Sequence, residues 1–132
     1  MVVVDTNILA YLLIEGDRTA DAQALFRRDP DWRSDEFVLI EFSNILATYQ
    51  RSGALTADMA EKLLDTATRT VSLIHTSHKG ALKVAMEFGV SAYDARFLAA
   101  ARHHESRLVT EDAKLRAAAP TLTLALAEAL PP

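Results

Sequence analysis

Four acidic residues could form one site with hydrolytic chemistry: Asp5, Glu41, Asp94 and Asp112. Carboxylates held close together repel and raise one another's pKa values unless a divalent cation compensates their charge. The chain contains no cysteine, and oxygen ligands without thiolates favour Mg²⁺ or Mn²⁺ over zinc. Such an ion can hold a phosphodiester and lower the pKa of a water. The four acids therefore predict metal-assisted phosphodiester hydrolysis.

Three of these acids also have an ordinary structural explanation. Asp5 follows the apolar run Val2–Val4 and could cap the next helix. Asp94 stands three residues after Ser91, which is the spacing of a capping box with Asp in place of Glu or Gln. Asp112 likewise stands at an expected helix start. For each of the three, helix capping and metal binding stay open as alternatives.

Glu41 is harder to explain by capping, because it lies inside a predicted helix. Its neighbours on that helix include Phe37, Val38 and Ile45, so we expect the carboxylate to point inward from a largely apolar face. A buried carboxylate is rare unless it is paired or bound to a metal. A salt bridge to an arginine is the alternative to metal binding. Asn44 could orient Glu41, contact a substrate or form ordinary amide hydrogen bonds.

Composition narrows the class of protein. A chain of 132 residues predicts one domain, residues 1–132, whose core is large enough that stability needs no metal. A net charge of −4 and a pI of about 5.5 argue against a protein that binds nucleic acid over its whole surface, although they allow a local basic rim. Neither a membrane-spanning stretch nor a secretion signal is recognisable, so we expect a cytoplasmic protein with no membrane partner.

An alternation of strands and helices must position the acids. The predicted strands are Val2–Val4, Trp32–Ser34, Val71–Ile74, Leu108–Thr110 and Leu122–Leu124. The predicted helices are Ile8–Ile14, Thr19–Arg28, Asp35–Arg51, Thr56–Arg69, Ser77–Phe88, Ser91–His104 and Asp112–Ala118. This order indicates an α/β fold, a three-layer α/β/α sandwich with a small, mainly parallel sheet. Sites in such folds form at the carboxyl ends of the strands.

Four motifs carry a resemblance to a known family. They are V-V-D-T-N-I-L at 3–9, I-E-F-S-N-I-L at 40–46, S-A-Y-D-A-R-F-L-A-A-A at 91–101 and L-V-T-E-D-A-K-L at 108–115. Each motif is short, but their order and spacing extend across essentially the whole chain. With these motifs the chain resembles the PIN-domain family, and within it the small VapC-type toxins of bacterial toxin–antitoxin pairs.

The resemblance implies a role for each matching residue. Asp5 and Asp94 match direct ligands of Mg²⁺ or Mn²⁺, whereas Glu41 and Asp112 match acids that act directly or through water. One of the four, which the resemblance does not identify, would help to deprotonate the attacking water. Two polar residues match positions that support the first and last acids, namely Asn7 and Thr110. Glu111 is an alternative to its neighbour Asp112, although the T-x-D spacing favours Asp112.

The resemblance also implies partners. The substrate would be RNA, the chain would form a homodimer, and a cognate antitoxin could place a basic side chain at the acidic site. Helices Thr56–Arg69 and Ser77–Phe88 have apolar stripes that could serve dimerisation. Candidates for a basic rim that contacts RNA are Arg51, Lys79, Lys83 and Arg96, each of which could instead lie on an ordinary solvated helix face.

Three other functions stay open at this point. The chain could be a PIN nuclease for RNA processing or DNA ends without an antitoxin. It could be a phosphatase with Asp5 as the nucleophile, although Asn7 stands where such enzymes commonly have a second aspartate. It could also be a non-catalytic interaction module in which every acid is a helix cap, and this alternative predicts no metal binding.

Overall fold

A parallel sheet of five strands forms the centre of the molecule, in the order β3-β2-β1-β4-β5. The computed structural model describes residues 1–130, so the last two residues of the predicted domain lie outside it. The strands are β1 (Val2–Val4), β2 (Trp32–Asp35), β3 (Val71–Ile74), β4 (Leu108–Val109) and β5 (Thr123–Leu124). The α/β class and the parallel sheet predicted from the sequence are confirmed.

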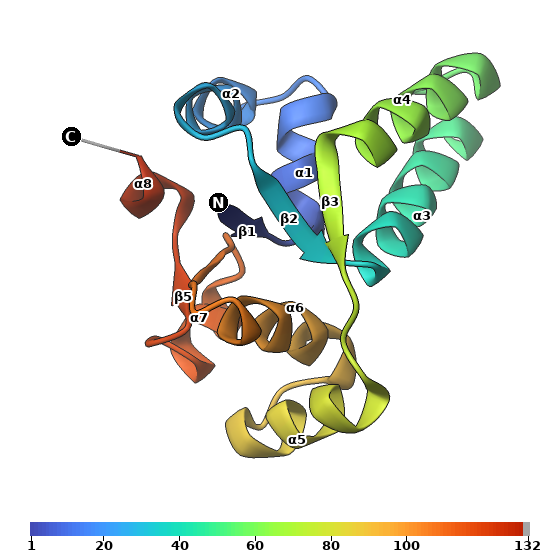
Figure 1. The fold of residues 1–132 in the computed structure, drawn as a ribbon. Coiled ribbons are helices and arrows are strands. Elements are labelled where there is room, and N and C mark those ends of the chain that lie inside the picture. The colour runs from blue at the N-terminus through green and yellow to red at the C-terminus, as the bar shows by residue number, and fades with distance from the viewer. Residues whose placement is uncertain (131–132) are drawn as a thin grey trace.

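Helices cover both faces of this sheet (Figure 1). One face carries α1 (Thr6–Leu13), α2 (Thr19–Arg28), α3 (Phe37–Arg51) and α4 (Ala57–Thr70). The other carries α6 (Ala92–His103), with α5 (His78–Phe88) packed on its outer side. Two short helices, α7 (Ala113–Ala118) and α8 (Leu126–Ala129), flank the last strand. Within residues 1–130, no helix has the length and apolar character needed to cross a bilayer.

The central strand shows why the apolar run at the start of the chain is continuous rather than alternating. In β1, Val3 and Val4 are both fully buried, because helices cover both faces of the sheet. β1 pairs with β2 on one side and with β4 on the other. The carboxyl end of β1 therefore lies in the middle of this edge of the sheet, and Asp5 is the next residue.

The helix caps agree with the sequence. The side chains of Thr56, Ser77 and Ser91 each accept a hydrogen bond from the backbone amide three residues later. Gly89 ends α5 in the left-handed conformation, with φ of 67°, which a residue without Cβ adopts at little cost. These caps fix where α4, α5 and α6 begin and, through α6, where Asp94 stands.

Asp35 belongs to a strand and not to the helix in which the sequence analysis placed it. The predicted helix Asp35–Arg51 begins instead at Phe37, and Asp35 is the last residue of β2. The Asp35 carboxylate is fully buried and accepts hydrogen bonds from the Phe37 amide and from Arg96. A contact with a residue 61 positions away therefore fixes its conformation. The helix α8 was not predicted, and α1 begins at Thr6 rather than at Ile8 because Asp5 caps it.

Candidate functional site

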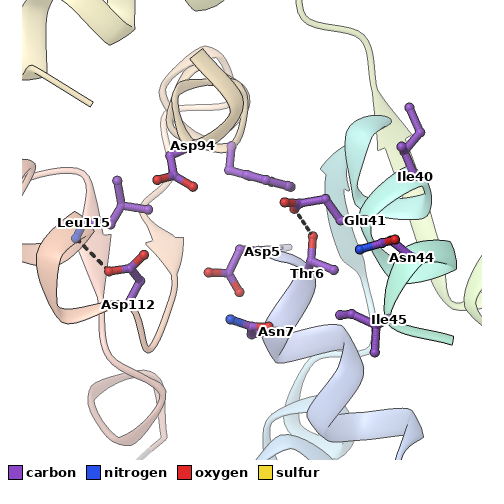
Figure 2. Close-up of a pocket in the computed structure, with 11 residues that line it drawn as sticks. Asp5, Thr6, Asn7, Ile40, Glu41, Asn44, Ile45, Asp94, Asp112 and Leu115 are labelled. Atoms are coloured by element: carbon purple, nitrogen blue, oxygen red, sulfur yellow. Dashed lines mark hydrogen bonds between the residues drawn. The ribbon is translucent and has the colours of Figure 1, made fainter. Parts of the chain in front are cut away.

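A pocket of about 360 Å³ at the carboxyl edge of the sheet contains all four predicted acids. Figure 2 shows Asp5 near its centre, with Asp94 and Asp112 on one side and Glu41 on the other. These acids come from the end of β1, the first turn of α6, the start of α7 and the middle of α3. The other lining residues are Thr6, Asn7, Ile40, Asn44, Ile45, Phe97 and Leu115.

Asp5 has both of the roles that its sequence position allows. Its Oδ1 accepts the amide of Ile8 at 3.2 Å and so caps α1, while its Oδ2 accepts the hydroxyl of Thr110 at 2.5 Å. Burial raises the pKa of Asp5 from 3.8 to about 6, against the effect of these two hydrogen bonds. The nearby carboxylates of Glu41 and Asp112 raise this pKa further. Capping and site membership are therefore compatible for this residue.

Thr110 connects the first and last acids. Its hydroxyl donates to Asp5 and accepts the backbone amide of Asp112 at 3.1 Å. The side chain is fully buried behind the pocket. This single hydroxyl therefore fixes the relative position of two strand ends that carry acids.

Thr110→Val is expected to lower the free energy of unfolding by about 1–3 kcal/mol, because valine has the same shape but leaves the Asp5 carboxylate and the Asp112 amide without this partner. Urea unfolding at pH 7 with EDTA measures the change. Thr68→Val is the matched control, since its hydroxyl donates to the carbonyl of Leu64 on the exposed face of α4. Equal stabilities for the two variants would contradict the structural role given to Thr110.

Asp112 caps α7, and its neighbour Glu111 turns away from the pocket. The Asp112 Oδ1 accepts the amides of Lys114 and Leu115 at 3.0 and 3.1 Å. Glu111 instead accepts the amide of Leu126 at 2.8 Å and pairs with Arg18 and Arg116. Of these two adjacent acids, Asp112 is the one that lines the pocket.

Asp94 lies in the first turn of α6, where Ser91 is the cap. The Ser91 hydroxyl accepts the backbone amide of Asp94 at 3.0 Å, so one half of the expected capping box is present. Burial and, to a smaller extent, the charge of Asp112 raise the pKa of Asp94, while the Ser91 hydroxyl lowers it. The helix start thus holds this carboxylate at the pocket wall beside another acid.

Glu41 faces the pocket rather than the apolar core, which corrects the expected inward orientation. Its side chain is half-buried, and its Oε1 accepts the hydroxyl of Thr6 at 2.6 Å. Among residues 1–130 it has no ion pair, so the arginine salt bridge considered as an alternative is absent there. Thr6 lines the pocket, and the sequence analysis did not single it out. Its place directly after Asp5, at the start of a helix, was the available signal.

The two asparagines line the pocket without supporting the acids. Asn7 is exposed, and Thr110 rather than Asn7 donates to Asp5. Asn44 lies one turn after Glu41 on the same side of α3, where its amide faces the pocket (Figure 2). Both amides are therefore available to a ligand. The predicted support of Asp5 by Asn7 is not found among the hydrogen bonds of residues 1–130.

The charged residues that line the pocket are all acidic. Its lining, all within the described residues, includes four carboxylates and no lysine, arginine or histidine. Within residues 1–130, no three acidic or histidine side chains are close enough together to coordinate one metal ion. A cation that binds here would therefore have to bring the carboxylates closer together. The donors are carboxylate and amide oxygens, which suit Mg²⁺ or Mn²⁺. The lack of a basic lining residue and the presence of oxygen donors both fit a hard divalent cation.

The basic residues proposed for an RNA-binding rim do not line this pocket. Arg96 is wrong as a rim residue, because its side chain is only 14% exposed and pairs with the buried Asp35. Arg51, Lys79 and Lys83 are exposed on α3 and α5. RNA contact by these three residues stays a prediction.

Without metal, the stability of the protein is expected to fall as the pH rises from about 4 to 6. Folded Asp5 keeps its proton up to a pKa of about 6, whereas the unfolded carboxyl loses it near 3.8, so the folded state binds more protons in this range. The difference corresponds to about 3 kcal/mol. Urea unfolding in EDTA between pH 3.5 and 7 measures it.

Asp5→Asn is the matched variant for this pH series. The amide oxygen of the new side chain can still accept the Ile8 amide and cap α1, while its NH2 group takes the place of Oδ2 and can donate to the Thr110 hydroxyl, and the side chain does not titrate. We expect Asp5→Asn to equal or exceed the parent in metal-free stability at pH 7 and to lose this part of the pH dependence. A large drop in melting temperature at pH 7 would instead show that the Asp5 charge serves capping.

Relatives of known structure share this architecture. A crystal structure of a Pyrobaculum aerophilum protein matches with a TM-score of 0.76 and 21% identity, covering 96% of this chain and 83% of that one. A toxin–antitoxin complex from Klebsiella pneumoniae matches with a TM-score of 0.67 and 21% identity, covering 96% and 98%. VapBC2 from Rickettsia felis, bound to a promoter DNA fragment, matches with a TM-score of 0.69 and 15% identity, covering 95% and 98%. At these identities the matches establish a shared fold.

Sequence comparison identifies the family as well as the fold. The chain is 26% identical over 125 residues to Ribonuclease VapC3 of Pyrobaculum aerophilum, an alignment that covers 91% of this chain and 95% of the relative. The PIN domain family model matches residues 2–120, a span that includes every strand except β5 and all four acids of the pocket. The chain therefore belongs to the PIN-domain family.

Proposed function

We propose that this protein is a Mg²⁺- or Mn²⁺-dependent ribonuclease that acts as the toxin of a toxin–antitoxin pair. The observation that carries the proposal is the pocket, in which Asp5, Glu41, Asp94 and Asp112 meet with no basic lining residue. Carboxylates in this arrangement favour a bound cation, because it removes their mutual repulsion. Membership of the PIN-domain family supports a nuclease as the type of enzyme.

The pocket residues divide into ligands and positioning groups. We assign Asp5 and Asp94 as direct metal ligands, and Glu41 and Asp112 as ligands directly or through water. A divalent cation held there supplies positive charge to the scissile phosphate and lowers the pKa of a water. One of the four carboxylates accepts the proton of the attacking water.

The remaining polar groups orient the acids and the substrate. Thr110 holds Asp5, and Thr6 holds Glu41, each through one hydroxyl donor. Asn7 and Asn44 line the same pocket and can hydrogen-bond an RNA strand. We therefore expect substitutions of the two asparagines to affect RNA binding more than metal binding.

The relatives supply the substrate and partner of the proposal. One is named a ribonuclease, one structural relative is a toxin–antitoxin complex and another is VapBC2 bound to promoter DNA, so we infer RNA as the substrate and a cognate antitoxin as the inhibitor. The acidity of the pocket supports this inference, because an antitoxin arginine or lysine would be attracted to four carboxylates. A short gene for a DNA-binding antitoxin immediately upstream would favour the toxin role over an RNA-processing nuclease.

The homodimer also belongs to the proposal. Helices α4 and α5, which correspond to the predicted helices Thr56–Arg69 and Ser77–Phe88, leave Met59, Leu82 and Met86 exposed. Exposed apolar side chains of this kind are suited to an interface between two copies. Sedimentation equilibrium measures the association directly.

Cleavage of structured RNAs by the purified protein tests the proposed function. We expect cutting with Mg²⁺ or Mn²⁺, loss of cutting in EDTA, and recovery when Mn²⁺ is added in excess. A small phosphate monoester serves as the second substrate and should stay intact, whereas the phosphatase alternative requires its hydrolysis. RNA cutting that EDTA leaves unchanged would contradict the proposal.

A further inference from the structure

A buried ion pair outside the pocket joins its two walls. Asp35 ends β2, and its Oδ2 accepts both the amide of Phe37 at 2.8 Å and the Nε of Arg96 at 2.9 Å. The Nη2 of Arg96 also donates to the carbonyl of Thr76 at 2.9 Å, just beyond β3. Phe37 begins α3 and Arg96 belongs to α6, so this cluster connects helices on opposite faces of the sheet (Figure 1).

Aromatic contacts make a second connection at the same place. The ring of Phe37 stacks on that of Tyr93, with centroids 5.4 Å apart and planes at 21°. It also lies 6.5 Å from the ring centroid of Phe97. Both contacts join the first turn of α3 to α6. The two helices are therefore held together by named side chains at their amino-terminal ends.

These connections lie close in sequence to two of the pocket acids. Glu41 follows Phe37 by one helical turn in α3, and Asp94 is adjacent to Tyr93 and two residues before Arg96 in α6. Glu41 and Asp94 stand on opposite sides of the pocket (Figure 2). A tilt of α3 against α6 would therefore change the separation of their carboxylates.

We propose that the Asp35–Arg96 ion pair positions Glu41 and Asp94 relative to each other and thereby sets the affinity of the pocket for a divalent cation. The inference rests on the proposed function. Apolar packing is non-directional, whereas a guanidinium that donates to a carboxylate and a carbonyl at once has a fixed geometry. Asp35 and Arg96 are positioning residues in this account, because neither lines the pocket.

Removing the pair as a unit separates this role from a simple loss of stability. Arg96→Met alone leaves the buried Asp35 charge without a partner and endangers folding, so the test uses the neutral double variant Asp35→Asn/Arg96→Met. The matched control is Asp31→Asn/Arg33→Met, which removes an exposed Asp–Arg pair at the start of β2.

The first readout needs no metal. The chain has no cysteine, so spin labels at Gln50→Cys and His103→Cys report only the separation of α3 and α6. Both positions are exposed and lie at the helix ends far from the ion pair, where a small tilt is amplified. We expect double electron–electron resonance to show a displaced or broadened distance distribution in the Asp35→Asn/Arg96→Met background and the parent distribution in the control.

The second readout is the Kd for Mn²⁺, measured by electron paramagnetic resonance at a temperature where every variant is folded. We expect Asp35→Asn/Arg96→Met to bind about 10-fold more weakly than the parent and the control to bind like the parent. A double variant that keeps either the parent distance distribution or the parent Kd overturns the inference alone. A parent that binds no Mn²⁺ overturns the proposed function as well.

Discussion

Asp94→Asn is expected to lower the rate of RNA cleavage by about 100-fold or more without unfolding the protein. The substitution removes one negative charge from the set that binds the cation, and an interaction of several kcal/mol with the reacting phosphate corresponds to at least this factor. The fold should persist, because Ser91 caps α6 through the Asp94 backbone amide, which the asparagine keeps. Single-turnover cleavage of one structured RNA with Mg²⁺ measures the rate.

Asp58→Asn is the matched control for this substitution. Asp58 stands in the first turn of α4, another helix with a hydroxyl cap, but it is exposed, and within residues 1–130 its one ion pair is with Lys62. We expect it to cut RNA at the parent rate and to melt at nearly the parent temperature. A folded Asp94→Asn protein that cuts as fast as Asp58→Asn would exclude Asp94 from the site.

Arg96→Met is expected to have the largest effect on stability, a loss of about 3–5 kcal/mol in the free energy of unfolding. Of the two donors that Asp35 Oδ2 has within residues 1–130, the substitution leaves this fully buried carboxylate with the Phe37 amide. The other oxygen, Oδ1, has no hydrogen-bond partner among residues 1–130 and cannot offset the loss. Such a change is a large part of the stability of an ordinary domain. Urea unfolding at pH 7 measures it.

Asp35→Asn in the same background separates charge burial from packing. We expect Asp35→Asn/Arg96→Met to recover much of the stability that Arg96→Met loses, because a neutral amide costs less to bury than an unpaired carboxylate. If Arg96→Met alone cost less than about 1 kcal/mol, the pair would behave like an exposed salt bridge, and its buried description would be wrong.

The order of the strands and helices could be predicted because the residues that end strands and cap helices are easy to recognise in this sequence. Val2–Val4 is a buried run that ends in Asp-Thr-Asn, and Thr56, Ser77 and Ser91 all cap the helices expected after them. Once the class was α/β, the carboxyl ends of neighbouring strands had to share one edge. This geometric rule was enough to predict that Asp5 and Asp112 lie near each other.

What the sequence did not reveal depends on contacts between residues far apart in the chain. The hydrogen bond from Thr6 to Glu41 spans 35 positions, and the pair of Asp35 with Arg96 spans 61. Asp35 looked like the first residue of a helix because acids favour helix starts, and its burial only follows from a partner on α6. Arg96 was a candidate for the basic rim or for a solvated helix face, because its partner Asp35 lies 61 positions away in the chain. Local patterns cannot distinguish such residues from surface ones.

The central claim is that the four carboxylates bind a divalent cation, and calorimetric titration of Mn²⁺ into the parent and into Asp5→Asn tests it most directly. Asp5 belongs at the centre of the measurement, because it is the most buried of the four and the charges of Glu41 and Asp112 both act on it. We predict saturable Mn²⁺ binding by the parent at pH 7 and binding at least about 10-fold weaker by folded Asp5→Asn. Equal affinities for the two proteins, or no binding by the parent, would contradict the account.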